Sequence, residues 1–177
     1  LHLLRRLVRS HGAVAGVVIQ TISGAVHEIL ERAGREMPTR QAAYELTVRW
    51  AAEEDPVLAA ELGGLTDGYE VALGAIRDLV DAGFTPENEA GVLDQLAELG
   101  PVIPAAERRR AEALVRVATR VHRAGRELRI GPHAARIRVA AGVLRDEGAA
   151  CFPTRACLVH GFADVTGVVA DVLEALI

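Results

Sequence analysis

The feature that most constrains this chain of 177 residues is a long helical block between two short apolar segments. Residues 17–21 (VVIQT) are β-branched and follow a glycine, and residues 156–159 (ACLV) form a second short apolar run, so both are predicted to be buried strands. The roughly 120 residues between them are too many for an ordinary crossover connection. Because isolated strands need a sheet, the sequence predicts a predominantly helical α/β fold, a partial parallel sheet interrupted by a helical subdomain. An all-helical bundle, with neither strand formed, is the alternative.

Apolar residues at helical spacing, with Gly and Pro at the ends, predict helices along the rest of the chain. Aromatic residues are only 3% of the chain, so the core must be built from Ala, Val and Leu, which favours close-packed helices. Ser23 is expected to cap the first helix after residues 17–21, and Gly34 to end it. The expected helices cover residues 23–33, 38–56, 67–81, 86–100, 104–125, 132–148 and 166–177, and an amphipathic helix opens the chain with Leu3, Leu4, Leu7 and Val8.

The net charge of −4 is distributed very unevenly. Residues 41–104 hold two arginines and thirteen acidic residues, whereas residues 105–145 hold eleven arginines and three acidic residues. All 20 basic residues are arginine, which excludes a Walker A lysine or a Schiff-base lysine. The basic segment therefore predicts phosphate contacts, and the alternative is a solvated face or pairing with the acidic segment.

The predicted helix over residues 104–125 carries these arginines on one face. With Leu114 taken as the inward direction, further apolar side chains fall on the same side and four arginines fall opposite. The apolar side comprises Leu114, Val117, Ala118, Val121 and Leu128. The four arginines predicted to contact the DNA backbone are Arg109, Arg116, Arg120 and Arg123.

Two segments resemble motifs of superfamily 1 DNA helicases of the UvrD/Rep type. Residues 158–166 (LVHGFADVT), followed by a leucine-rich helix, resemble motif II, with Val159, Phe162 and Asp164 in register. Residues 20–30 (QTISGAVHEIL) resemble motif Ib, in which a strand runs into a helix. That family inserts a helical subdomain, called 1B, between these motifs. The resemblance implies that residues 1–34 and 150–177 are parts of a RecA-like 1A-type domain, and that residues 35–149 are the inserted 1B-like subdomain.

Departures from the family pattern imply a chain that does not hydrolyse ATP. His160 and Gly161 stand where motif II has the Asp that holds Mg²⁺ and the Glu that activates water, and neither residue can replace them. The chain then resembles most closely the non-catalytic, N-terminal helicase-like segment of an AddB-type DNA-repair helicase–nuclease subunit. The implied partners are a helicase–nuclease subunit and DNA, whose backbone Thr21 and Ser23 would contact without sequence preference. No catalytic residue, metal or cofactor is expected in this chain.

Other functional signals are weak. Cys151, Cys157 and His160, with His133, fit no common zinc spacing, and Cys157 falls in the predicted buried strand. No signal peptide or membrane-spanning run is visible, so a cytoplasmic location without membrane contact is expected, and the start at Leu1 suggests a piece of a longer protein. The alternative function, from a different class, is an all-helical ligand-binding or dimerisation module of a bacterial regulator.

Overall fold

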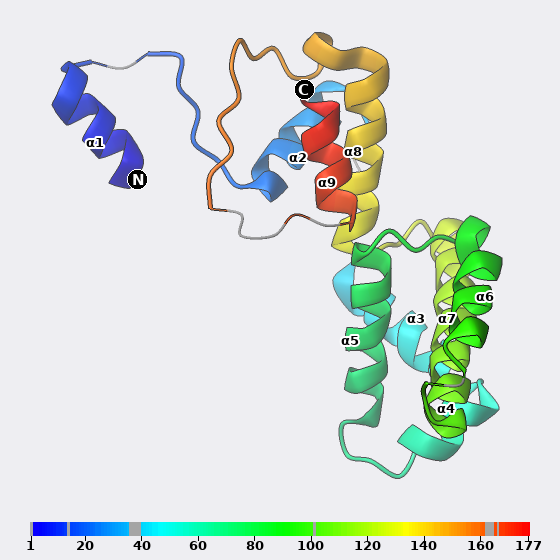
Figure 1. Cartoon of the computed structure of the whole chain (residues 1–177). Coiled ribbons are helices and arrows are strands. Elements are labelled where there is room, and N and C mark those ends of the chain that lie inside the picture. Colours follow the sequence, from blue (N-terminus) through cyan, green and yellow to red (C-terminus); the bar gives the residue numbers. More distant parts are fainter. Residues whose placement is uncertain (1, 14, 36–39, 101, 162–164, 166) are drawn as a thin grey trace.

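The chain folds into packed helices (Figure 1). The computed structural model describes residues 2–13, 15–35, 40–100, 102–161, 165 and 167–177, and every regular element within them is helical. The α-helices are α1 (His2–His11), α2 (Ile22–Arg32), α3 (Gln41–Glu53), α4 (Pro56–Leu62), α5 (Gly68–Asp81), α6 (Glu89–Glu98), α7 (Ala105–Leu128), α8 (His133–Glu147) and α9 (Gly167–Ala175). Two single 3₁₀ turns, η1 (Pro86–Asn88) and η2 (Gly148–Ala150), precede α6 and follow α8.

The two segments predicted to be strands are irregular and lie at the surface. Val18 is 73% exposed and Leu158 is 97% exposed, and neither residues 17–21 nor residues 156–160 pair with a neighbouring strand. A β-branched run favours extended backbone, but a strand forms only where its amide and carbonyl groups find a partner. The predicted parallel sheet is therefore wrong. Because the RecA-like fold is built on such a sheet, the resemblance to AddB-type and other superfamily 1 helicases is overturned as well.

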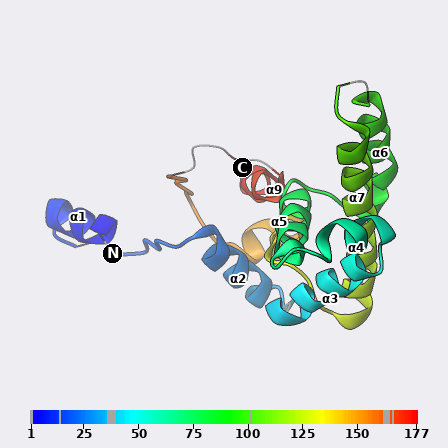
Figure 2. The same ribbon diagram turned by 90° about the horizontal axis from the view of Figure 1, so that it is seen from below.

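The helices pack in two adjoining groups. α2, α8 and α9 form one group, and α3 to α7 form the other, in which α7 contacts all four of its neighbours (Figures 1 and 2). The groups meet where the start of α9 lies against the end of α5. A side chain at Gly167 would collide there with the carbonyl oxygen of Asp81, and Gly167 also has a positive φ of 58°, so this contact requires glycine. The predicted domain boundaries at residues 34 and 150 stay a prediction.

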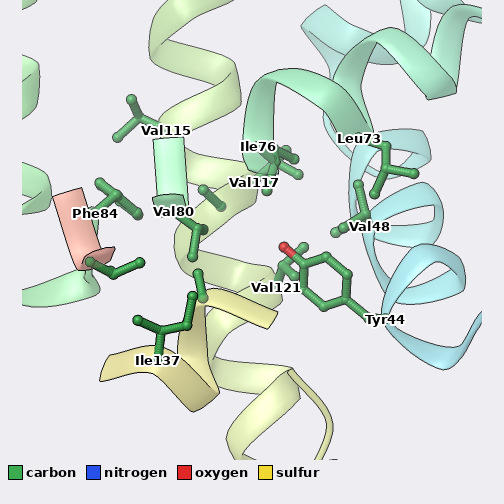
Figure 3. Packing of buried hydrophobic residues seen from close by; sticks show 14 of the residues in the cluster. Tyr44, Val48, Leu73, Ile76, Val80, Phe84, Val115, Val117, Val121 and Ile137 are labelled. Atoms are coloured by element: carbon green, nitrogen blue, oxygen red, sulfur yellow. The ribbon is translucent and has the colours of Figure 1, made fainter. Parts of the chain in front are cut away.

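One continuous core runs through both groups, and small aliphatic side chains dominate it, as the composition predicts. Ile76 of α5 and Val117 and Val121 of α7 are buried at its centre (Figure 3). The ring of Tyr44, on α3, lies among them with its hydroxyl directed toward α7. Such cores depend on close packing of many small groups, so a cavity left by one truncated side chain is costly.

Some helix ends follow the sequence signals and others do not. The helix predicted to end at residue 125 continues to Leu128, and the one predicted from residue 86 begins with the 3₁₀ turn η1. Gly34 ends the α2 segment with a positive φ of 64°, as predicted. Thr21, rather than Ser23, is the N-cap of α2, because its side chain accepts a hydrogen bond from the Gly24 amide. The helix predicted over residues 38–56 is divided: α3 ends at Glu53, and α4 begins at Pro56. The predicted start at residue 38 lies outside the described residues.

In the part of the chain that the structure describes, none of the helices combines the length and the apolar character needed to span a bilayer.

Candidate interaction surfaces

The long helix α7 places its arginines as the sequence predicts. Val117, Ala118 and Val121 are buried, and Arg109 and Arg123 are exposed on the opposite side. The prediction fails at Leu128, which is 59% exposed, because it is the last residue of α7 and the chain turns there toward α8.

Two of the four predicted DNA-contact arginines are held by the fold itself. The Nη2 atom of Arg116 lies 3.5 Å from Oδ2 of Asp55. Nη1 of Arg120 donates a hydrogen bond of 3.1 Å to the carbonyl oxygen of Ala51 and lies 3.8 Å from Oε2 of Glu54. Both arginines therefore join α7 to the turn between α3 and α4. The basic and acidic segments therefore pair with each other at these two arginines, which is one of the alternatives to phosphate contact that the charge distribution allows.

Asp55 is the centre of that turn. Its side chain is almost fully buried, and its Oδ1 atom accepts hydrogen bonds from the amides of Val57 at 3.0 Å and Leu58 at 3.2 Å. Asp at the N-cap and Pro at the first helical position form a standard start for a helix, so the sequence did contain a signal for α4. The carboxylate satisfies two amides at the helix start, and Arg116 offsets its charge.

Arg109 and Arg123 have a different environment. Both are exposed, and within the described ranges no acidic side chain forms an ion pair with either. The predicted phosphate-binding face therefore reduces to these two arginines. Their role in DNA contact stays a prediction.

Thr21 and Ser23, the two residues predicted to contact DNA from α2, also make contacts within the chain. Thr21 caps α2, and the Oγ atom of Ser23 lies 3.0 Å from Nε2 of His133, at the start of α8. One turn along, Nη2 of Arg136 lies 3.4 Å from Nδ1 of His27. These polar contacts join α2 to α8. Sequence reasoning missed them because Ser23 and His133 are 110 positions apart.

The Ser23–His133 pair resembles the nucleophile and base of a hydrolase in distance only. Both side chains are exposed, and among the described residues no carboxylate accepts a hydrogen bond from the imidazole. A serine nucleophile needs an oriented base and a site that excludes water. The geometry therefore supports a structural contact between helices.

The other predicted positions lie at the surface or outside the described residues. His160 and Gly161 are exposed in an irregular segment, and Asp164 is not described. Cys157, predicted to be buried in a strand, is exposed because no strand forms, whereas Cys151 is buried and burial raises the pKa of its thiol. Across the described ranges, no three His, Cys, Asp or Glu side chains group as metal ligands would.

The most unusual surface is at the N-terminus. We call α1 and residues 12–21 together the N-terminal arm. Both ribbon views show α1 standing away from the helical body (Figures 1 and 2). Val8 on α1, and Val17 and Ile19 in the extended part, are between 41% and 47% exposed. The arm therefore presents apolar side chains to solvent.

A second apolar surface lies on the outer side of α3. Leu46 is 67% exposed and Trp50 is 49% exposed, and both follow Ala42 at intervals of four residues. Residues four apart lie above one another on a helix, so these three form a line along it. We call this line the α3 stripe. Large exposed apolar residues arranged together are typical of binding surfaces.

Comparisons of the chain with protein-family models, with curated proteins and with solved structures find no match. What the geometry defines is a helical protein with a detached N-terminal arm and a separate apolar stripe.

Proposed function

We propose that this chain is a dimerisation module whose N-terminal arm docks on a second copy of the chain. The observation that carries the proposal is the detachment of α1, an amphipathic helix whose described side chains take no part in the core. This corresponds to the dimerisation alternative derived from the sequence. No catalytic step is part of the proposed function.

A free α1 is a poorly stable element. It has ten residues, and isolated helices shorter than about 12–15 residues are marginal in water. Full burial of an apolar side chain such as Leu7 or Val8 contributes about 1.5–3 kcal/mol relative to exposure. Docking would thus supply the free energy that holds α1 in its helical form.

Charge favours a second copy of this chain as the partner. α1 carries Arg5, Arg6 and Arg9 and no acidic residue. Residues 41–104 of the same chain contain thirteen acidic residues against two arginines. Opposite charges on two surfaces steer their encounter and select the orientation in which they meet. Each copy carries both the basic arm and the acidic body, so two copies are complementary.

The proposal is tested by measuring molar mass with light scattering after size-exclusion chromatography. The unmodified chain should elute with the mass of a dimer, and a Leu7→Asp, Val8→Asp variant should elute as a monomer that loses at most the helicity of the ten residues of α1. Leu99→Asp, at another exposed position at the end of α6, is the matched control and should remain dimeric. A monomeric mass for the unmodified chain across micromolar concentrations would refute the proposal.

Contact with the DNA backbone is a second candidate function, favoured by the exposed Arg109 and Arg123. Each phosphate contact adds about 0.9 to the slope of log K against log salt, so an Arg109→Glu, Arg123→Glu variant should bind duplex DNA more weakly and lower that slope by about 1.8. Arg120→Gln is the control, because the fold already holds Arg120. Equal affinity of the Arg109→Glu, Arg123→Glu variant and the unmodified chain would exclude this function.

A further inference from the structure

We infer that α1 of one copy docks on the α3 stripe of the other copy, and that the exchange is reciprocal. This inference rests on the proposed dimerisation and names the surface that receives the arm. It joins two apolar surfaces that the structure leaves exposed on separate helices.

The two surfaces match in length and chemistry. Ala42 and Trp50 lie eight positions apart, or about 12 Å at a rise of 1.5 Å per residue, and the ten residues of α1 span about 15 Å. Leu46 and Trp50 project to solvent while Tyr44 and Val48 of the same helix face the core. Tryptophan is enriched among the residues that dominate binding energy at interfaces. The α3 stripe therefore offers a large aromatic side chain to the apolar face of α1.

The charges beside the stripe complement those of α1. Glu45, Glu53 and Glu54 have side chains between 41% and 51% exposed, and they lie on or directly after α3. Each already pairs with one arginine of its own chain. A carboxylate has about four lone-pair sites and can accept further donors. At this exposure such pairs contribute little affinity, but they select the orientation of a helix that carries only arginine charges.

The arrangement of the chain favours the second copy over its own α3. Both ribbon views place α2 between α1 and α3 (Figures 1 and 2). Residues 12–21 can span at most about 33–36 Å when fully extended, and to reach α3 of the same chain they would have to pass over α2. A second copy can present its α3 without that obstacle. Reciprocal docking gives a closed two-fold dimer, in which the same surfaces are used twice and no further copies add.

A complementation experiment tests the inference on the full chain. The arm variant (Leu7→Asp, Val8→Asp) keeps an intact stripe, and the stripe variant (Leu46→Ser, Trp50→Ser) keeps an intact arm. Each alone should be monomeric, with a dimer Kd raised about 100-fold or more. An equimolar mixture should recover a heterodimer held by one of the two contacts. The matched control, Leu65→Ser with Val71→Ser, removes two equally exposed apolar side chains from the same acidic segment and should leave the dimer intact.

Fluorescence gives an independent readout, since Trp50 is the only tryptophan of the chain. Its emission should shift to the blue in the unmodified dimer and remain at longer wavelength in the arm variant. A stripe variant that stays dimeric while the arm variant is monomeric would overturn the inference and leave the proposed function standing. A monomeric unmodified chain would overturn the proposed function itself. Circular dichroism confirms that each variant is folded.

Discussion

Replacing Asp55 with alanine tests how the acidic and basic segments are joined. The Oδ1 atom of Asp55 accepts the amide hydrogens of Val57 and Leu58 at the start of α4. Loss of an N-cap side chain costs about 1 kcal/mol and up to about 2. Because the Leu58 amide is buried, the loss of its acceptor places this cost at about 1–3 kcal/mol. The free energy of unfolding should therefore fall by about 1–3 kcal/mol.

The partner of Asp55 contributes much less. Arg116 lies 3.5 Å away, and its side chain is 43% exposed, so water screens the pair and its contribution is about 0–1 kcal/mol. Arg116→Gln should thus be nearly neutral. Asp55→Asn keeps an oxygen that accepts the same amides and should cost about 1 kcal/mol or less. Asp67 is the matched control, because it stands at the N-cap of α5 and accepts no capping hydrogen bond, so Asp67→Ala should change nothing measurable.

Urea denaturation followed by circular dichroism at 222 nm measures these differences. All variants are compared at one protein concentration, since the stability of a dimer depends on concentration. At about 2–4 °C per kcal/mol for a chain of this size, Asp55→Ala should also lower Tm by about 2–12 °C. The reasoning is refuted if Asp67→Ala costs as much as Asp55→Ala, or if asparagine at position 55 is as destabilising as alanine.

Three further predictions concern the core and the thiols. Gly125→Ala should destabilise the protein by about 1–3 kcal/mol, because the new Cβ would lie 2.7 Å from a backbone carbonyl oxygen. A Cβ added at Gly142 would meet no atom within 4 Å, so Gly142→Ala should stabilise the protein by about 0.5–1 kcal/mol in thermal unfolding. Burial raises the pKa of Tyr44 to about 12, so ionisation of the phenol is disfavoured in the folded protein. The contribution of Tyr44 to the free energy of unfolding is present below pH 10 and should be lost as the pH rises from 10 to 12. Urea titrations of Tyr44→Phe should lack that loss. A thiol reagent should modify Cys157 rapidly and the buried Cys151 only after unfolding, with Cys157→Ser removing the fast phase.

The helices were largely predictable because their signals are local. Apolar spacing and end residues place α5, α7 and α8 within a few residues of their observed bounds. The error at α3 and α4 also has a local cause. The sequence predicts that one helix ends at Pro56, whereas Asp55 and Pro56 together begin the next. A proline one position after an N-cap residue starts a helix as readily as it stops the preceding one.

The strands could not be predicted in the same way. Residues 17–21 have the composition of a buried strand, but burial and pairing depend on partners elsewhere in the chain. The resemblance to helicases requires both strands to pair in one sheet. Neither strand forms, so the helicase assignment fails as a whole. The Ser23–His133 contact failed to be predicted for the same reason, because nothing local relates positions 110 apart.

The folded structure shows which charges of the chain are already paired and which are not. In the sequence, the basic segment 105–145 is the natural site for a negatively charged partner. In the fold, the acidic segment takes up part of that charge through the pairs Arg110–Glu61, Arg116–Asp55 and Arg120–Glu54.

The charges of the N-terminal arm are not paired in this way. Within the described residues, Arg5, Arg6 and Arg9 form no ion pair, and neither do Asp67 and Glu70 on the helical body. The arm therefore keeps positive charge that its own fold does not pair, and Asp67 and Glu70 leave unpaired negative charge at the start of α5. These opposite charges favour contact between the arm of one copy and the body of another.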